Sequence, residues 1–148
     1  MIITDEALLR TPCEPVLPEE VADIRQKLEA ELKLSGDRGR PGIGLAAPQI
    51  GIFKRFAIIR VTGTNGKQYN IDLANARIAK GFDEALFRKE GCLSFPGKFV
   101  NTKRYTEIWV VDNMVEPYSF IASGLLACVI AHELNHLDGI LLPDLAVK

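Results

Sequence analysis

Two histidines stand four residues apart with a glutamate directly after the first: His132, Glu133 and His136. On a helix, residues at this spacing share one face, so both imidazoles can reach a single metal ion. Glu133 would then lie where it can exchange a proton with a water at that ion, as in the HExxH pattern of metal hydrolases. A chance pattern with two histidines satisfied in the core is the alternative. Because a carboxylate after an apolar stretch needs a partner, the pattern favours a metal site.

Such a site needs a third protein ligand, and the residues after His136 offer poor candidates. A metzincin-type enzyme would have a histidine at position 142, where this chain has Leu142. A thermolysin-like enzyme would need a glutamate from a later helix, but the acids that follow His136 are Asp138 and Asp144. The third ligand is therefore expected upstream.

The three cysteines are the upstream candidates. Cys128 precedes His136 by two turns or about 12 Å along a helix, too far for one ion to bind both together with His132. Cys13 lies in a proline-flanked segment and is interpreted as structural. Cys92 follows Gly91, which lets the backbone approach closely. Cys92 is the favoured ligand, giving a Cys, His, His site with an open fourth position.

The elements that would carry these residues can be predicted from periodicity and turn signals. Apolar residues at helical spacing predict a helix over 19–34, which Gly36 would end. A second helix is expected over 124–137, with Ser123 as N-cap and Gly139 at its end. Strands are expected over 53–61, 68–73, 107–112 and 118–121, the first two joined by an Asn65-Gly66 turn. A block of strands followed by one late helix predicts an α+β fold with antiparallel sheets.

The bulk properties fit one ordinary domain, residues 1–148, with 47% hydrophobic and 25% charged residues. A net charge of -1 gives no bulk attraction to nucleic acid or to an anionic membrane. The N-terminus lacks a signal-peptide pattern, and the most apolar stretch, 125–131, is too short to span a bilayer. We therefore expect a cytoplasmic protein, or the mature form of an organellar one, whose cysteines are free thiols or ligands.

Three segments together resemble the peptide deformylase family. Residues 42–49, GIGLAAPQ, are similar to its first motif, GxGLAAPQ. Residues 90–94, EGCLS, match its second motif, which supplies the thiolate ligand, and 132–136 match its third, HExxH. The three occur in the family's order and span most of the chain. The chain departs from the family's usual Gln and Asp at Ala131 and Asn135, which alters the surroundings of the ligands but not the ligand set.

The resemblance implies antiparallel sheets packed around a central helix that carries HExxH. It implies removal of the N-formyl group from the initiator methionine of nascent chains, by an enzyme that works near the ribosomal exit tunnel, reads no nucleic-acid sequence and needs no membrane. It also implies one divalent metal ion, Fe(II) in the native state, with zinc, nickel or cobalt accepted. These ions suit a site with mixed imidazole and thiolate ligands.

The motif positions carry the family's roles onto this chain. Gln49 would donate its side-chain amide to the oxyanion, with the backbone N–H of Leu93 as companion donor. Ile43 and Gly44 would pair with an extended peptide, and Arg104 stands where the family often has a substrate-facing arginine. Glu133 would be the general base. The methionine side chain would enter an apolar slot formed by Leu125, Cys128 and Val129, which precede His132 by one or two turns.

Two rival functions differ from this interpretation. A small HExxH zinc endopeptidase would share His132 to His136 but would not explain EGCLS or GIGLAAPQ. A deformylase-like protein that binds peptide ends or ribosomes without catalysis would have no need of Glu133, which this chain retains.

Overall fold

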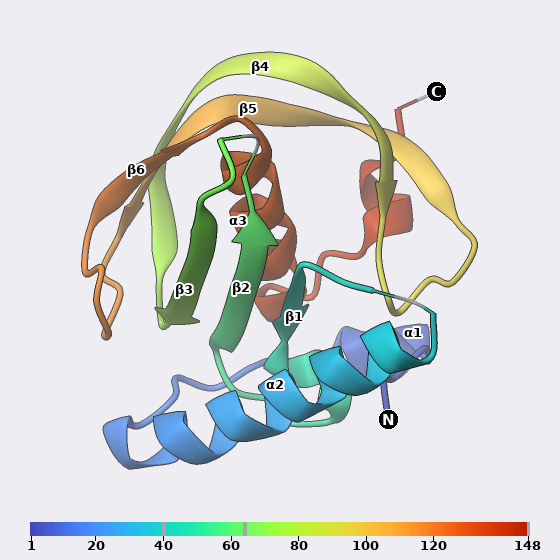
Figure 1. Cartoon of the computed structure of the whole chain (residues 1–148), viewed down its shortest axis with the longest axis vertical. Coiled ribbons are helices and arrows are strands. Elements are labelled where there is room, and N and C mark those ends of the chain that lie inside the picture. The colour runs from blue at the N-terminus through green and yellow to red at the C-terminus, as the bar shows by residue number, and fades with distance from the viewer. Residues whose placement is uncertain (40, 64, 148) are drawn as a thin grey trace.

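The computed structural model describes residues 1–39, 41–63 and 65–147, in which two antiparallel sheets enclose one helix (Figure 1). The α-helices are α1 (Glu6–Leu9), α2 (Val21–Asp37) and α3 (Gly124–Leu137), and the 3₁₀ helices are η1 (Pro18–Glu20), η2 (Ala47–Ile50) and η3 (Leu142–Leu145). The strands are β1 (Gly44–Ala46), β2 (Phe56–Thr62), β3 (Gln68–Ala74), β4 (Arg77–Gly91), β5 (Phe99–Val111) and β6 (Phe120–Ser123). None of the helices in these ranges is long and apolar enough to cross a bilayer.

The first sheet has the strand order β1-β2-β3, and all its pairs are antiparallel. Its β2 and β3 form the hairpin expected from Asn65-Gly66, with Thr62 opposite Gln68 next to the turn. Gly66 has φ +78°, a conformation that glycine adopts at little cost. Strand β1 pairs with β2 on one side only among the described residues, so its other edge can face a ligand.

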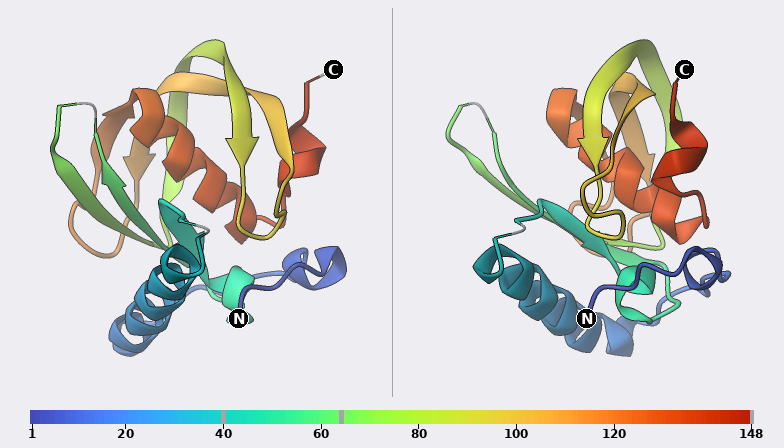
Figure 2. Two further views of the ribbon diagram at one scale, coloured as in Figure 1. Left: turned by 45° about the vertical axis from the view of Figure 1, so that its right-hand side comes forward. Right: turned by 90° about the vertical axis from the view of Figure 1, so that its right-hand side faces the viewer.

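The second sheet has the order β4-β5-β6, and its long β4 and β5 arch over the molecule (Figures 1 and 2). Along β5, the even-numbered residues from Thr102 to Val110 lie mostly on the inner face, while Lys103 and Trp109 are exposed. The pairing of β4 with β5 shifts between Phe87 and Glu90. There, two residues of β4 stand opposite one residue of β5, which is the pattern of a β-bulge.

Helix α3 lies between the two sheets and contacts β1, β2 and β5 (Figure 2). Its apolar residues Ala127, Ile130 and Leu134 are buried in one cluster with side chains from both sheets. Helix α2 covers the first sheet from outside through Val21, Ile24 and Leu28, which pack in a second cluster with residues of β1 and β2. Helix α3 carries apolar residues on several sides, and its place between the two sheets removes most of its surface from water.

Most elements agree with the expectations, and the differences have physical causes. The predicted α+β class, the antiparallel sheets and the helix over 124–137 are confirmed. Gly36 does not end α2, which continues to Asp37, and the last short strand is 120–123 rather than 118–121. Ser123 occupies the N-cap position of α3, but its side chain makes no capping hydrogen bond. Gly139 follows the end of α3 with φ +71°, as a helix-terminating glycine should.

Strand β4 was not expected from the sequence. Its 15 residues show no strict alternation of buried and exposed positions, and Glu90 is the one fully buried among them. An arching strand that touches the core only in part has little need of alternating apolar side chains. The periodicity on which strand prediction depends is therefore absent from it.

Candidate metal centre and active site

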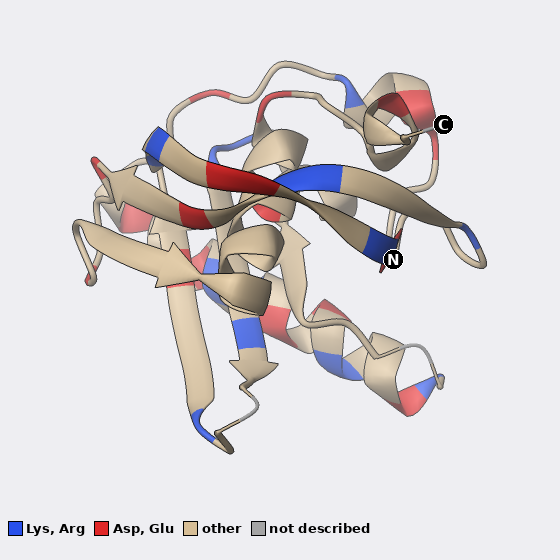
Figure 3. Cartoon of the chain, turned by 90° about the horizontal axis from the view of Figure 1, so that it is seen from above, with Lys and Arg blue, Asp and Glu red and all other residues tan. Residues whose placement is uncertain are grey.

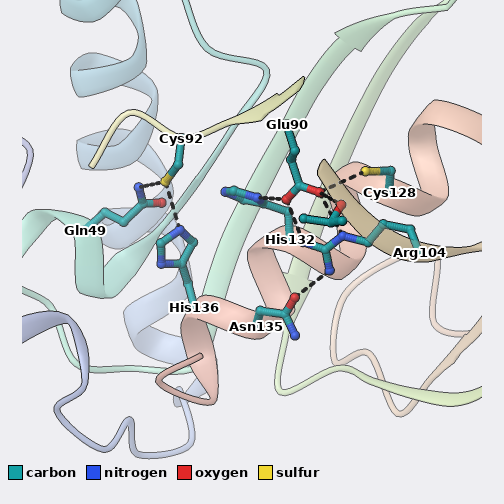
Figure 4. A network of polar contacts seen from close by, with 9 residues as sticks. Gln49, Glu90, Cys92, Arg104, Cys128, His132, Asn135 and His136 are labelled. Carbon is teal, nitrogen blue, oxygen red and sulfur yellow. Dashed lines mark hydrogen bonds and ion pairs between the residues drawn. The ribbon is translucent and has the colours of Figure 1, made fainter. Parts of the chain in front are cut away.

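Cys92, His132 and His136 come together at the centre of the molecule. One ligand atom from each, a sulfur and two imidazole nitrogens, lie within 4.8 Å of one another. The Cys92 Sγ lies 3.3 Å from Nε2 of His136, and the two imidazole rings are 5.1 Å apart in an edge-on arrangement. Helix α3 places the two histidines one turn apart, and Cys92 follows directly after β4 (Figure 4). The upstream cysteine favoured by the sequence is thus the one beside the histidines.

The surroundings of these three side chains fit a metal ion. His132 Nδ1–H donates a hydrogen bond to the carboxylate of Glu90, at 2.6 Å, which leaves its Nε2 for the ion. Burial and the neighbouring His132 lower the pKa of His136 to about 3, so this imidazole is neutral as a ligand must be. Thiolate and imidazole donors suit borderline ions such as Zn²⁺, Fe²⁺ and Ni²⁺. Three protein ligands would leave a position open for water or substrate.

In the protein without a metal ion, hydrogen bonding favours the charged form of the His132 imidazole. Burial lowers its pKa, but hydrogen bonds to Cys92 and Glu90 outweigh burial and raise the pKa to about 10. An ion at this position would bind the neutral imidazole. The buried carboxylate of Glu90 compensates the positive charge in either case, whether it is on the imidazole or on an ion.

Glu90 is a functional residue of the site to which sequence reasoning gave no role. Its carboxylate is 4% exposed and accepts hydrogen bonds from Thr102 Oγ1 at 2.7 Å and from Arg104 Nη2 at 2.6 Å (Figure 4). Burial raises its pKa, but the bonds to His132 and Arg104 outweigh this and hold the pKa far below its usual range. A carboxylate two residues before Cys92 was the available signal. Its partners became visible only once β4 and β5 were paired.

Arg104 does not lie where a substrate-facing arginine would. Its side chain is 8% exposed and forms two bonds to Glu90, and its Nη1 donates to Asn135 Oδ1 at 2.6 Å. It is absent from the side chains that line the cavity described below. The even-numbered positions of β5 point inward, which is why Arg104 turns toward the ligands instead of the solvent. A role in direct substrate contact does not fit this placement.

Glu133 lies beside the two histidines and is 3% exposed. Its Oε1 is buried and has no hydrogen-bond partner. Burial raises its pKa to about 7, against the opposing effect of His132. A carboxyl group that titrates near neutrality can both accept and return a proton in one reaction cycle.

Gly44 makes room for Glu133. A Cβ atom at this position would stand 2.6 Å from Glu133 Oε2, closer than real contacts of this kind. The backbone of β1 therefore passes directly against the carboxylate, and any larger residue at position 44 would displace it.

Gln49 and Leu93 lie on the other side of the site. Ala46 N–H donates to Gln49 Oε1 at 2.9 Å, and Gln49 Nε2 donates to Ser94 Oγ at 3.0 Å. The same Nε2 lies 3.6 Å from Cys92 Sγ (Figure 4). The amide is thus held with its donor end directed at the metal ligands, and Leu93 follows Cys92 on the cavity wall.

A cavity of about 540 Å³ opens beside these groups. All the expected substrate contacts except Arg104 line it: Ile43, Gly44, Gly91, Leu125, Cys128 and Val129. Several lining residues were not expected, because they come from β4, from the loop into β5 and from the start of β5: Phe87, Lys89, Phe95, Lys98 and Phe99. The thiol of Cys128 donates toward Glu90 Oε1, at 3.7 Å, and burial raises its pKa to about 12, so it stays protonated.

The fold, and the grouping of Cys92, His132 and His136 beside Glu133, are typical of a metal-dependent hydrolase of the HExxH type. A family model described as polypeptide deformylase matches residues 1–148. A peptide deformylase of Rhizobium meliloti is 35% identical over the whole chain and 84% of its own length. Peptide deformylase 1 of Bacillus subtilis is 40% identical, with 95% of this chain and 85% of its own length covered.

Solved structures agree with these relatives. A probable peptide deformylase from the Synechococcus phage S-SSM7 has a TM-score of 0.82 at 32% identity, with 98% of both chains covered. The peptide deformylase of Synechococcus elongatus in complex with actinonin has a TM-score of 0.83 at 30% identity, covering 100% of this chain and 78% of that one. The chain belongs to the polypeptide deformylase family. Its activity is peptide deformylation, the hydrolysis of a linear amide by a metal-dependent enzyme.

Proposed function

We propose that this chain removes the N-formyl group from the formylmethionine of newly made polypeptides, with Cys92, His132 and His136 holding one divalent ion. The observation that carries the proposal is the cluster of one sulfur and two imidazole nitrogens within 4.8 Å, beside Glu133 in a cavity large enough for a peptide end. The native ion is Fe(II), and zinc, nickel and cobalt are substitutes. When bound, such an ion acts as a Lewis acid that activates water and polarises the formyl carbonyl.

Glu133 moves the proton. Its buried Oε1 has no partner in the protein, so it is available to the water that attacks the formyl carbon. The same oxygen then delivers the proton to the nitrogen of the leaving amine. Formate and a free amino terminus are the products. A positioned group of this kind contributes about 10²- to 10⁴-fold to the rate.

Gln49 and the backbone N–H of Leu93 stabilise the negative charge that develops on the formyl oxygen. Ala46 and Ser94 fix the orientation of the Gln49 amide before substrate arrives. A donor that is already oriented costs no reorganisation during the reaction.

The peptide lies along the free edge of β1. Ile43 and Gly44 offer backbone groups to an extended chain, and Gly91 lines the same cavity. The methionine side chain enters between Leu125, Cys128 and Val129 of α3, which all line the cavity. Cys128 suits this place as a small protonated thiol with the packing properties of an apolar side chain.

The direct experiment compares formylated and unformylated Met-Ala-Ser peptides with purified, metal-loaded protein. Formate release from the formylated peptide is expected, with no cleavage of either peptide chain. Glu133→Gln should retain metal and lose nearly all turnover, while Glu107→Gln, a half-buried glutamate on the outer sheet, should keep both. Cleavage inside the unformylated peptide would support the endopeptidase instead. Binding without any formate release would support a non-catalytic peptide-binding protein.

We also propose that residues 1–148 form one catalytic domain that works on nascent chains, in the cytoplasm or in an organellar stroma or matrix. The three apolar clusters draw on segments from both ends of the chain, which supports one cooperative unit. Calorimetry should therefore give a single unfolding transition. Cosedimentation with ribosomes that carry a formylated nascent chain tests the association with the exit tunnel.

A further inference from the structure

The mouth of the cavity carries two lysines. Lys89 and Lys98 both line it, and both are exposed. The carboxylates that line it are Glu90 and Glu133, which are 4% and 3% exposed, and Glu90 is already paired with Arg104. The solvent side of the cavity therefore presents positive charge that no exposed carboxylate of the lining offsets. In Figure 3, basic residues colour the end of β4 and the loop that leads into β5.

The backbone fixes both lysines in place. Lys89 belongs to the bulge of β4, has φ +57°, and its N–H donates to Asn101 Oδ1 at 3.1 Å. If the same residues of β4 continued in regular pairing after Phe87, Lys89 would point toward the core and Glu90 toward the solvent, because side chains alternate along a strand. Lys98 follows Gly97, which has φ +74°, and its N–H donates to Phe95 O at 3.2 Å. Both ammonium groups are thus carried on ordered backbone.

Neither ammonium group is engaged by another residue of the part of the chain that the structure describes. Among residues 1–39, 41–63 and 65–147, no ion pair or side-chain hydrogen bond involves Lys89 Nζ or Lys98 Nζ. Lys54, by contrast, pairs with both Glu14 and Glu20. A lysine with an internal partner gains little from an external anion, whereas these two are available to one.

We propose that Lys89 and Lys98 make this enzyme select formylated peptides with Asp or Glu shortly after the formylmethionine. The inference rests on the proposed function, since the formyl end must reach Glu133 for the following residues to pass the mouth. Contacts between exposed charges are weak, so each lysine should contribute about a 1.4- to 5-fold preference in kcat/KM for an acidic over a basic peptide. The preference should fall as salt is added, because the Debye length shortens to about 8 Å at physiological ionic strength.

The test measures kcat/KM for formyl-Met peptides that carry Glu, Gln or Lys at the second, third or fourth position. All peptides are amidated at the C-terminus, so that a terminal carboxylate cannot imitate an acidic side chain. We expect Glu over Gln over Lys at one position at least, with a Glu-to-Lys ratio of about 2- to 25-fold in low salt. Equal rates for the three peptides at every position, or a preference for Lys, would overturn the inference.

The matched variants are Lys89→Gln with Lys98→Gln, compared with Lys103→Gln. Lys103 is exposed on the outer face of β5, where it pairs with Leu86, and it does not line the cavity. The double variant should bring the Glu-to-Lys ratio close to one, while Lys103→Gln should keep the ratio of the unmodified enzyme. An equal loss of the ratio in both would show that general surface charge, and not the cavity mouth, sets it.

Turnover of the Gln peptides separates this inference from the proposed function, because it shows that deformylation occurs. Equal rates for the Glu, Gln and Lys peptides would then refute the selectivity alone. If no formylated peptide is turned over, the proposed function fails and the inference fails with it. Affinities of the same peptides for the Glu133→Gln variant should follow the order Glu, Gln, Lys. A different order would place the discrimination outside binding and would contradict the role of the lysines.

Discussion

Replacing Arg104 by methionine should destabilise the protein far more than most arginine substitutions do. The pair with Glu90 is almost fully buried, with side chains 8% and 5% exposed, and its two bonds measure 2.9 and 2.6 Å. Breaking such a pair leaves a buried carboxylate with one positive partner fewer, and costs about 3–5 kcal/mol. Arg77 and Asp112 form a matched control at 2.7 Å, because their side chains are 62% and 63% exposed. Arg77→Met should cost about 0–1 kcal/mol.

The assay is urea denaturation of the metal-free protein at neutral pH, in a double-mutant cycle with Glu90→Gln. The double variant should lose less stability than the sum of the single ones, by about 0.5–3 kcal/mol, because the two residues share one interaction. Metal content should fall in Arg104→Met, since Glu90 orients His132.

The pH dependence follows from the lowered pKa of Glu90. A carboxyl group whose pKa is lower in the folded than in the unfolded protein stabilises the fold above the unfolded value, here 4.5. This contribution is lost as the pH falls below 4.5 toward the folded pKa. The penalty of Arg104→Met should therefore be largest at neutral pH and shrink in acid. A raised KM with unchanged stability would refute this reasoning and return Arg104 to the substrate.

Three further outcomes are expected. Cys92→Ser should lower metal affinity sharply, because an alcohol is a poorer anionic ligand than a thiolate. The control Cys13→Ser should keep its metal, and elemental analysis measures both. Equal metal content in the two variants would mean that the third ligand is misassigned. Gly44→Ala should displace Glu133, because its Oε2 would stand 2.6 Å from the new Cβ. This displacement should lower kcat by about 10²-fold or more, while the metal is retained. An unchanged kcat would contradict this packing argument. The iron form should lose activity in air faster than nickel or zinc forms, and equal decay would exclude metal oxidation as the cause.

The part of the site that lies on α3 could be predicted from the sequence. An apolar stretch at helical spacing, followed by HExxH and closed by Gly139, gave the correct bounds of 124–137. Helical geometry is local, so the relation of His132 to His136 follows from their spacing alone. Cys92 could be favoured because Cys128 was excluded by reach, Cys13 was interpreted as structural, and the residues after His136 offered poor ligands.

The partners that hold the ligands could not be predicted, because they depend on pairing between strands. Glu90 and Arg104 are 14 positions apart, and they meet because the β4–β5 register brings both to the inner face. That register includes a bulge, and β4 itself lacks the alternation by which strands are predicted. Arg104 was expected to face the substrate because of the family resemblance, and the sequence alone offers no register by which its direction could be checked.

The bulge in β4 also determines how this chain can change its length. Two residues, Arg88 and Lys89, stand between Phe87 and Glu90, opposite the single residue Asn101. Phe87 and Glu90 both lie on the inner face, because the bulge accommodates the extra residue between them. Deleting Arg88 or Lys89 would restore regular pairing and leave Glu90 opposite Val100, still on the inner face toward His132. The cavity mouth can therefore lose one residue by a single-codon deletion without turning Glu90 away, and selection should tolerate such deletions.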